Sequence, residues 1–177
     1  RGKSEVAKRE EDVLAFWKDQ RIFERSLGKH APKGEFTFYD GPPFATGLPH
    51  HGSLLSSVIK DVIPRYKTMR GYHVPRRWGW DCHGLPIETE VEKKLNLKTK
   101  KDILALGIDT FNETARSMVL RYVDEWEKYV DRIGRWVDFK NSYKTMDNSY
   151  IETVWWTLKE IHKKKMLYEG KKVLMYC

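Results

Sequence analysis

Cysteine is scarce in this chain, and long apolar runs are missing altogether. The 177 residues contain only Cys82 and Cys177, too few for a disulfide framework, and such usage suits a reducing compartment. No apolar stretch approaches the roughly 20 residues that a membrane-spanning helix needs. The opening residues are charged and helical in pattern, unlike a secretory signal peptide. We therefore expect a cytoplasmic protein that has no membrane partner.

Acidic residues are outnumbered by basic ones. The chain has 25 Asp and Glu against 33 Lys and Arg, which gives a formal net charge of +8 and a pI near 9.4. Such an excess indicates a polyanionic partner, a nucleotide or a nucleic acid, although a solvated lysine-rich surface gives the same numbers. Apolar residues make up 40% and aromatic residues 13%, which excludes a disordered chain and favours one packed domain.

Internal repeats and low-complexity linkers are also missing, so the chain is divided by pattern alone. We expect a helical extension at residues 1–34, a βαβ unit at 35–86 and a helical segment at 87–177. The chain begins at Arg1 without Met and stops at Cys177 directly after an apolar run. These ends are what we expect of a piece of a longer protein.

Secondary-structure patterns favour an α/β fold with a Rossmann-like parallel sheet and additional helices. Aromatic and β-branched residues predict a strand at 36–40, apolar spacing predicts a helix from about 51 to a C-cap at Gly71, and a second strand follows at 72–78. Pro64 should kink or end the first half of that helix. The other expected elements are helices at 4–25, 87–95, 109–135 and 148–165, a helix start at Thr99, and a strand at 172–176. Apolar stripes on the helices are most simply core packing.

Residues 40–53 (DGPPFATGLPHHGS) carry the chemistry of the predicted βαβ unit. They connect its first strand to its helix, and ligands of open α/β sheets bind at this place, where a helix N-terminus favours phosphate. Neither a Rossmann glycine fingerprint nor a P-loop lysine occurs, which disfavours dehydrogenases and P-loop nucleotidases. By pattern alone, the paired histidines could equally be a capped turn with solvated imidazoles.

Several segments of the chain resemble one enzyme family. Residues 49–53 (PHHGS) resemble the HIGH signature of class I aminoacyl-tRNA synthetases, and residues 39–48 are similar to the lead-in of the isoleucyl enzymes. Residues 79–86 (GWDCHGLP) separate isoleucyl enzymes from leucyl and valyl ones. The resemblance continues through residues 150–156 and covers nearly the whole chain, so it is far more specific than a lone tetrapeptide.

The resemblance implies the first half of a HIGH-type catalytic domain, leading toward the insertion point of an editing domain. Such enzymes activate isoleucine with ATP and Mg²⁺ and pass it to tRNA(Ile), here as an expected monomer. His50 and Ser53 would be the catalytic pair at the phosphates, and Asp81 would bind the ammonium group of isoleucine. The implied ATP-binding residues are Gly41, Phe44, His50, Gly52 and Ser53, and the implied amino-acid-binding residues are Gly41, Pro42 and Asp81.

The sequence departs from the family pattern at the fourth position of the signature. Ser53 stands where the signature has His, which keeps a good helix N-cap but loses a donor to the phosphates. We expect weaker activation, by about 100-fold or more, the scale of one lost transition-state donor. The second family signature, Lys-Met-Ser-Lys-Ser, is absent, so the chain alone should be a weak or inactive enzyme. Cys177 would be a Zn²⁺ ligand only in the full-length protein.

Other functions remain open on the sequence. A valyl or leucyl synthetase would differ only in substrate, and a small HIGH-type nucleotidyltransferase would share the βαβ start. A non-catalytic RNA-binding module would rest on basic clusters such as residues 163–165, 171–172 and 76–77. These clusters are scattered over several expected elements, which fits a solvated surface equally well.

Overall fold

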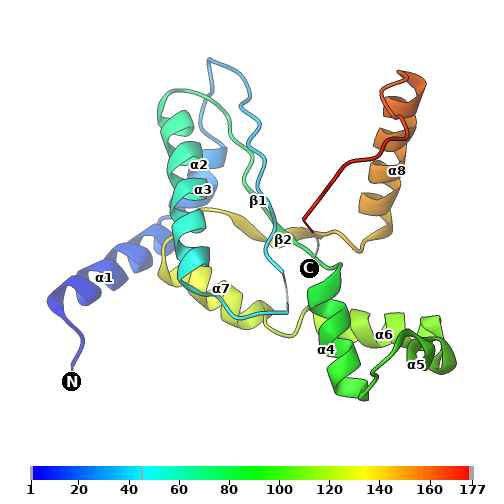
Figure 1. Cartoon of the computed structure of the whole chain (residues 1–177). Coiled ribbons are helices and arrows are strands. Elements are labelled where there is room, and N and C mark those ends of the chain that lie inside the picture. The colour runs from blue at the N-terminus through cyan, green and yellow to red at the C-terminus, as the bar shows by residue number, and fades with distance from the viewer. Residues whose placement is uncertain (1, 45, 176–177) are drawn as a thin grey trace.

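A pair of parallel strands lies at the centre of the chain, and helices surround it (Figure 1). The structure, a computed structural model, describes residues 2–44 and 46–175. The strands are β1 (Arg77–Trp80) and β2 (Asp138–Lys144). The helices are α1 (Glu5–Asp19), α2 (Ile22–Leu27), α3 (His51–Met69), α4 (Leu85–Leu95), α5 (Lys100–Leu106), α6 (Ile108–Val119), α7 (Val123–Arg132) and α8 (Asn148–Lys163). The predicted α/β class with a parallel sheet is confirmed.

Strand β1 lies between β2 and the extended segment 35–44. On one edge, Asp138 N donates to Arg76 O at 2.8 Å and Thr145 N donates to Trp80 O at 3.1 Å. On the other edge, Asp81 N donates to Pro43 O at 2.9 Å, next to a parallel bridge between Phe44 and Asp81. Alternate residues of a strand direct their backbone polar groups to opposite edges, so β1 pairs with a neighbour on each side. Both pairings are parallel.

The prediction of a strand at residues 36–40 is wrong, since that segment is extended but carries no ladder. It is bridged only near its ends, by Glu35 to His73 and by Phe44 to Asp81. Pro42 and Pro43 have no N–H to donate, so this part of the segment pairs only through an acceptor, Pro43 O, and the bridge at Phe44. The second predicted strand, at 72–78, begins further along the sequence than expected, because β1 starts at Arg77. The order of a βαβ unit is nevertheless present: segment 35–44, α3 and β1 follow one another, and the two extended parts are bridged in parallel.

The partner of β1 is a strand that the sequence did not indicate. β2 has the sequence DFKNSYK, with polar residues at most positions and no clear alternation. The predicted strand at 172–176 is absent from residues 172–175, and Tyr176 lies outside the described residues. Val173 is 99% exposed, so no neighbouring strand is there to pair with it.

Helix boundaries follow the capping signals closely, but two long predicted helices are interrupted. Ser4 caps α1 by accepting a hydrogen bond from Ala7 N at 3.2 Å, and Thr99 caps α5 in a capping box. Arg21 takes a left-handed conformation with φ 49° and divides the predicted helix 4–25 into α1 and α2. The predicted helix 109–135 is likewise divided into α6 and α7. Pro64 stays inside α3, which runs unbroken to Met69 with Gly71 in the left-handed region beyond it.

Tryptophans form the core beneath β1. Trp78, Trp80 and Trp126 pack with ring centroids 5.5 to 6.2 Å apart, in tilted or edge-to-face geometry. Their buried neighbours are Cys82, Ile87, Val119 and Val130. A second, smaller cluster joins α4 to α6 through Val91, Phe111 and Met118. The apolar face predicted for 109–135 therefore packs as expected.

The apolar stripes of α3 and α8 do not pack inward as expected. Leu55 and Val62 of α3 are 67% and 58% exposed, and Trp155 of α8 is 68% exposed. The side chains that α3 buries are Ser57, Pro64 and Thr68, a different face. Helical spacing identified the apolar face correctly, but no described element covers it.

Candidate active site

A cleft of about 240 Å³ opens at the N-terminal end of α3. Its walls come from the segment after Asp40, the first turns of α3, the Trp78–Trp126 core and Arg135. Four of the predicted site residues line it, namely Gly41, His50, Gly52 and Ser53. Three others, Pro42, Phe44 and Asp81, lie outside its lining.

His50 is the N-cap of α3. Its Nδ1 accepts a hydrogen bond from Gly52 N at 3.1 Å. In the neutral imidazole an accepting Nδ1 leaves the proton on Nε2, so Nε2–H is the free donor of this side chain. The imidazole of His50 can therefore cap the helix through Nδ1 and still offer Nε2–H as the donor that the family resemblance implies.

Ser53 is the third residue of α3 and supports the N-cap, His50, from within the helix. Its Oγ accepts a hydrogen bond from His50 N at 3.2 Å, which makes a capping box with the imidazole. The expectation that Ser53 would be the N-cap is therefore wrong, because the N-cap is His50, three residues earlier. A Cβ on Gly52 would lie 2.9 Å from His50 Cε1, so glycine at this position makes room for the capping imidazole.

Asp81 and Phe44 lie beside the cleft and are joined through their backbones. Phe44 bridges Asp81, whose N–H donates to Pro43 O, so the end of β1 and the segment after Asp40 meet here. Asp81 Oδ1 accepts a long hydrogen bond, 3.4 Å, from His83 N, and its side chain is half-buried. Pro42 is half-buried, and Phe44 is 43% exposed.

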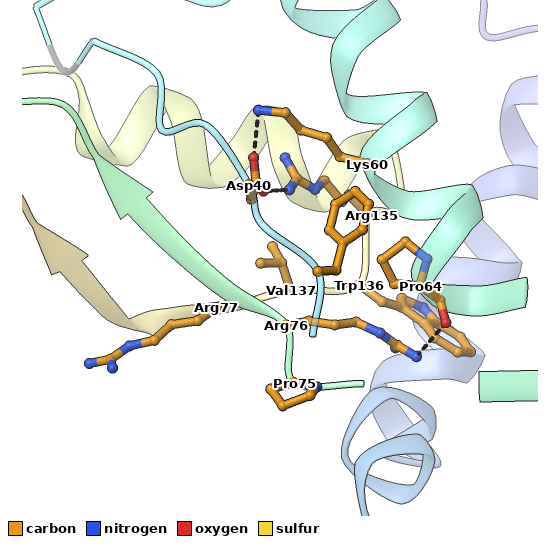
Figure 2. Close-up of a pocket in the computed structure, with 10 residues that line it drawn as sticks. Asp40, Lys60, Pro64, Pro75, Arg76, Arg77, Arg135, Trp136 and Val137 are labelled. Atoms are coloured by element: carbon orange, nitrogen blue, oxygen red, sulfur yellow. Dashed lines mark hydrogen bonds and ion pairs between the residues drawn. The ribbon is translucent and has the colours of Figure 1, made fainter. Parts of the chain in front are cut away.

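Three charged residues that the sequence did not single out meet at the wall of the cleft. Figure 2 shows Asp40 between Lys60 of α3 and Arg135, which lies between α7 and β2. Lys60 and Arg135 also line the cleft. Lys60 could have been found from its spacing, because Ser53, Ser56, Ser57 and Lys60 stand at i, i+3, i+4 and i+7 on one helix face. No local signal marks Arg135.

A smaller cavity of about 20 Å³ lies next to this cluster, beside the buried Arg76 (Figure 2). The guanidinium of Arg76 donates to Thr68 Oγ1, to Ser26 Oγ at 3.1 Å and to Pro64 O at 3.5 Å. Burial lowers the pKa of Arg76, and Asp61 opposes that shift while Arg65 adds to it. Arg76 thus joins α2, α3 and β1 rather than facing the cleft.

The expected zinc ligand, Cys177, lies outside the described residues. Among residues 2–44 and 46–175, no group of three or more His, Cys, Asp or Glu could hold a metal ion. Burial raises the pKa of Cys82, and Asp81 adds to that rise, so this buried thiol stays protonated. No helix within the described part of the chain is long and apolar enough to cross a membrane.

Residues 12–177 match the family of tRNA synthetases class I (I, L, M and V). The chain belongs to this family. Over 175 residues it is 57% identical to an isoleucine–tRNA ligase of Chlamydia pneumoniae and 54% identical to that of Treponema pallidum. It is also 53% identical over 169 residues to the cytoplasmic isoleucine–tRNA ligase of Arabidopsis thaliana. These alignments cover 99%, 99% and 96% of the chain but only 17%, 16% and 14% of the relatives.

A solved synthetase shares the fold of this chain. The structure of a LeuRS from Agrobacterium radiobacter, in a ternary complex with tRNA and LeuAMS, superposes with a TM-score of 0.54. The match covers 90% of this chain and 18% of that one, at 21% sequence identity. The chain therefore has the fold of the corresponding part of a class I synthetase and spans about a sixth of its curated relatives.

Proposed function

We propose that this chain forms part of the site in which a cytoplasmic, monomeric isoleucine–tRNA ligase activates isoleucine with ATP and passes it to tRNA(Ile). The observation that carries the proposal is the cleft at the N-terminus of α3, where His50, Gly52 and Ser53 of the signature meet Gly41. Identity of 53–57% to isoleucine–tRNA ligases over nearly the whole chain supports isoleucine as the amino acid.

The cleft is suited to the phosphates of ATP. The positive end of the dipole of α3 points toward it, and the first turn of α3 holds no acidic residue. Lys60 and Arg135 line the cleft, whereas none of its described lining residues is acidic. His50 Nε2–H would donate to a phosphate oxygen as the carboxylate of isoleucine attacks the α-phosphorus. Such a displacement needs positioned positive charge more than a covalent nucleophile, and Mg²⁺ would arrive bound to ATP.

The amino-acid end of the site would lie beside the cleft, at the end of β1. Asp81 would pair with the ammonium group of isoleucine, and Gly41 and Pro42 would offer an apolar wall for its side chain. The backbone contact between Asp81 and Pro43 brings these groups to one place. An apolar pocket separates isoleucine from valine, one methylene smaller, by about 1–3 kcal/mol.

Calorimetric titration of the chain tests the proposal, with a non-hydrolysable isoleucyl-adenylate analogue as ligand and the valyl analogue as control. We expect the isoleucyl analogue to bind about 10-fold or more tightly than the valyl one. Equal affinity for both analogues would contradict isoleucine specificity. Binding of generic RNA with a steep salt dependence, and no binding of either analogue, would favour a basic RNA-binding module instead.

A further inference from the structure

The charge cluster at the wall of the cleft consists of Asp40, Lys60 and Arg135. It joins three parts of the chain that are distant in sequence (Figure 2). Lys60 Nζ lies 2.5 Å from Asp40 Oδ1, and Arg135 pairs with the other oxygen of the same carboxylate. The side chains of Lys60, Asp40 and Arg135 are 23%, 17% and 6% exposed. Ion pairs at this depth are screened much less than surface pairs, so the cluster is able to hold backbone in place.

The backbone around Asp40 is fixed by the same groups and by their neighbours. Lys60 Nζ also donates to Gly41 O at 2.6 Å, and Tyr143 Oη donates to Asp40 O at 3.3 Å. Further along, the indole N–H of Trp126 donates to Gly47 O at 2.7 Å. Residues 41–44 therefore run between two anchored positions. Pro42 and Pro43 have no N–H, so the pairing of this segment is limited to the contact of Pro43 O with Asp81 N and the bridge between Phe44 and Asp81.

We propose that Asp40, Lys60 and Arg135 are positioning residues of the synthetase site. The cluster adds to the short pairing at Asp81 and holds Gly41 and Pro42 at a fixed distance from the N-terminus of α3. The isoleucyl end of one adenylate then meets Gly41, Pro42 and Asp81 while its phosphate meets His50. This inference rests on the proposed function, because it concerns how the two ends of the same site are held at the correct distance.

Another long-range ion pair of the chain provides a matched control. Arg132 of α7 pairs with Glu10 of α1 at 2.8 Å, and the two side chains are 48% and 53% exposed. It also connects distant elements, but neither residue lines the cleft. Glu10→Gln removes one carboxylate charge without touching the site, as Asp40→Asn removes one within it.

Two measurements on the free chain test the positioning role: hydrogen exchange by NMR and affinity for the isoleucyl-adenylate analogue. The Asp81 amide, bonded to Pro43 O, reports docking of residues 41–44, and the Trp126 amide, bonded to Tyr122 O inside the helical region, reports the core. Asp40→Asn should speed exchange at Asp81 but not at Trp126, and should weaken the analogue about 100-fold. Lys60→Arg, which keeps a cation between Asp40 and Gly41 O, should retain most of both properties, and Glu10→Gln should change neither.

Unchanged protection of the Asp81 amide in Asp40→Asn would overturn the proposal. Equal acceleration at Asp81 and Trp126 would also overturn it, because the cluster would then stabilise the whole fold rather than the loop. If the unaltered chain binds neither adenylate analogue, the proposed function fails, whereas exchange at Asp81 still decides whether the cluster positions residues 41–44.

Discussion

His50 and Ser53 contact each other in the capping box at the start of α3. This arrangement leaves the Nε2–H of His50 as the donor toward the cleft and occupies the hydroxyl oxygen of Ser53 with a backbone N–H. The sequence was sufficient to select these residues, because the signature itself names them. It was insufficient for Asp40 and Arg135, since contacts across 95 positions leave no local pattern.

Ser53→His restores the signature residue and separates its two effects. In the proposed full-length ligase, isoleucine-dependent pyrophosphate exchange should rise about 100-fold, because a donor to the phosphates is regained. The free energy of unfolding should fall by about 1 kcal/mol, because the acceptor for His50 N is lost. Ser56→His, which places the same imidazole one turn further along the cleft wall, is the control and should give no such rise. An unchanged exchange rate in Ser53→His would refute the role assigned to this position.

At the scale of elements, boundaries that depend on local chemistry were predictable and those that depend on distant partners were not. Ser4 and Thr99 start their helices as the capping signals indicate. The strand expected at 36–40 is extended backbone that is bridged only near its ends, at Glu35 and Phe44. β2 was missed because pairing with β1, rather than its own composition, makes it a strand. The apolar stripe of α3 was identified correctly, but no described element covers it.

Substitutions on α3 and α4 measure which apolar faces stabilise the chain. Leu55→Lys on the exposed face of α3 should change the free energy of unfolding by no more than about 0.5 kcal/mol. Ile87→Ala, at a side chain 3% exposed in the tryptophan core, should cost about 2–5 kcal/mol. Urea unfolding of both variants checks the contrast. A cost for Leu55→Lys equal to that of Ile87→Ala would show that the α3 face is covered in solution.

Across the molecule, one buried thiol and two half-buried phenols that stay neutral set the response to alkaline pH. Burial is the leading cause that raises the pKa of Cys82, Tyr129 and Tyr143. The unfolded chain therefore loses these protons first as pH rises past about 8.5 for the thiol and about 10 for the phenols. Each proton lost earlier by the unfolded state lowers the free energy of unfolding, so stability should be fully present at neutral pH and decline above about 8.5.

Urea unfolding between neutral pH and pH 10 checks this response. Cys82→Ala should remove the first part of the decline, although the absolute stability of that variant also falls because a buried side chain is shortened. A stability that stays level or rises above pH 8.5 in the unaltered chain would contradict burial of these groups.

The proposed isoleucyl-adenylate site is formed at one end by residues distant in this chain, although the chain spans only about a sixth of its curated relatives. The most direct measurement is the change in backbone amide NMR shifts when the isoleucyl-adenylate analogue is added. The largest changes should fall on Gly41, Gly52, Ser53 and Asp81, and Asp81→Ala should abolish them. Changes confined to the basic residues 163–165 and 171–172, or no change at all, would contradict the proposed site.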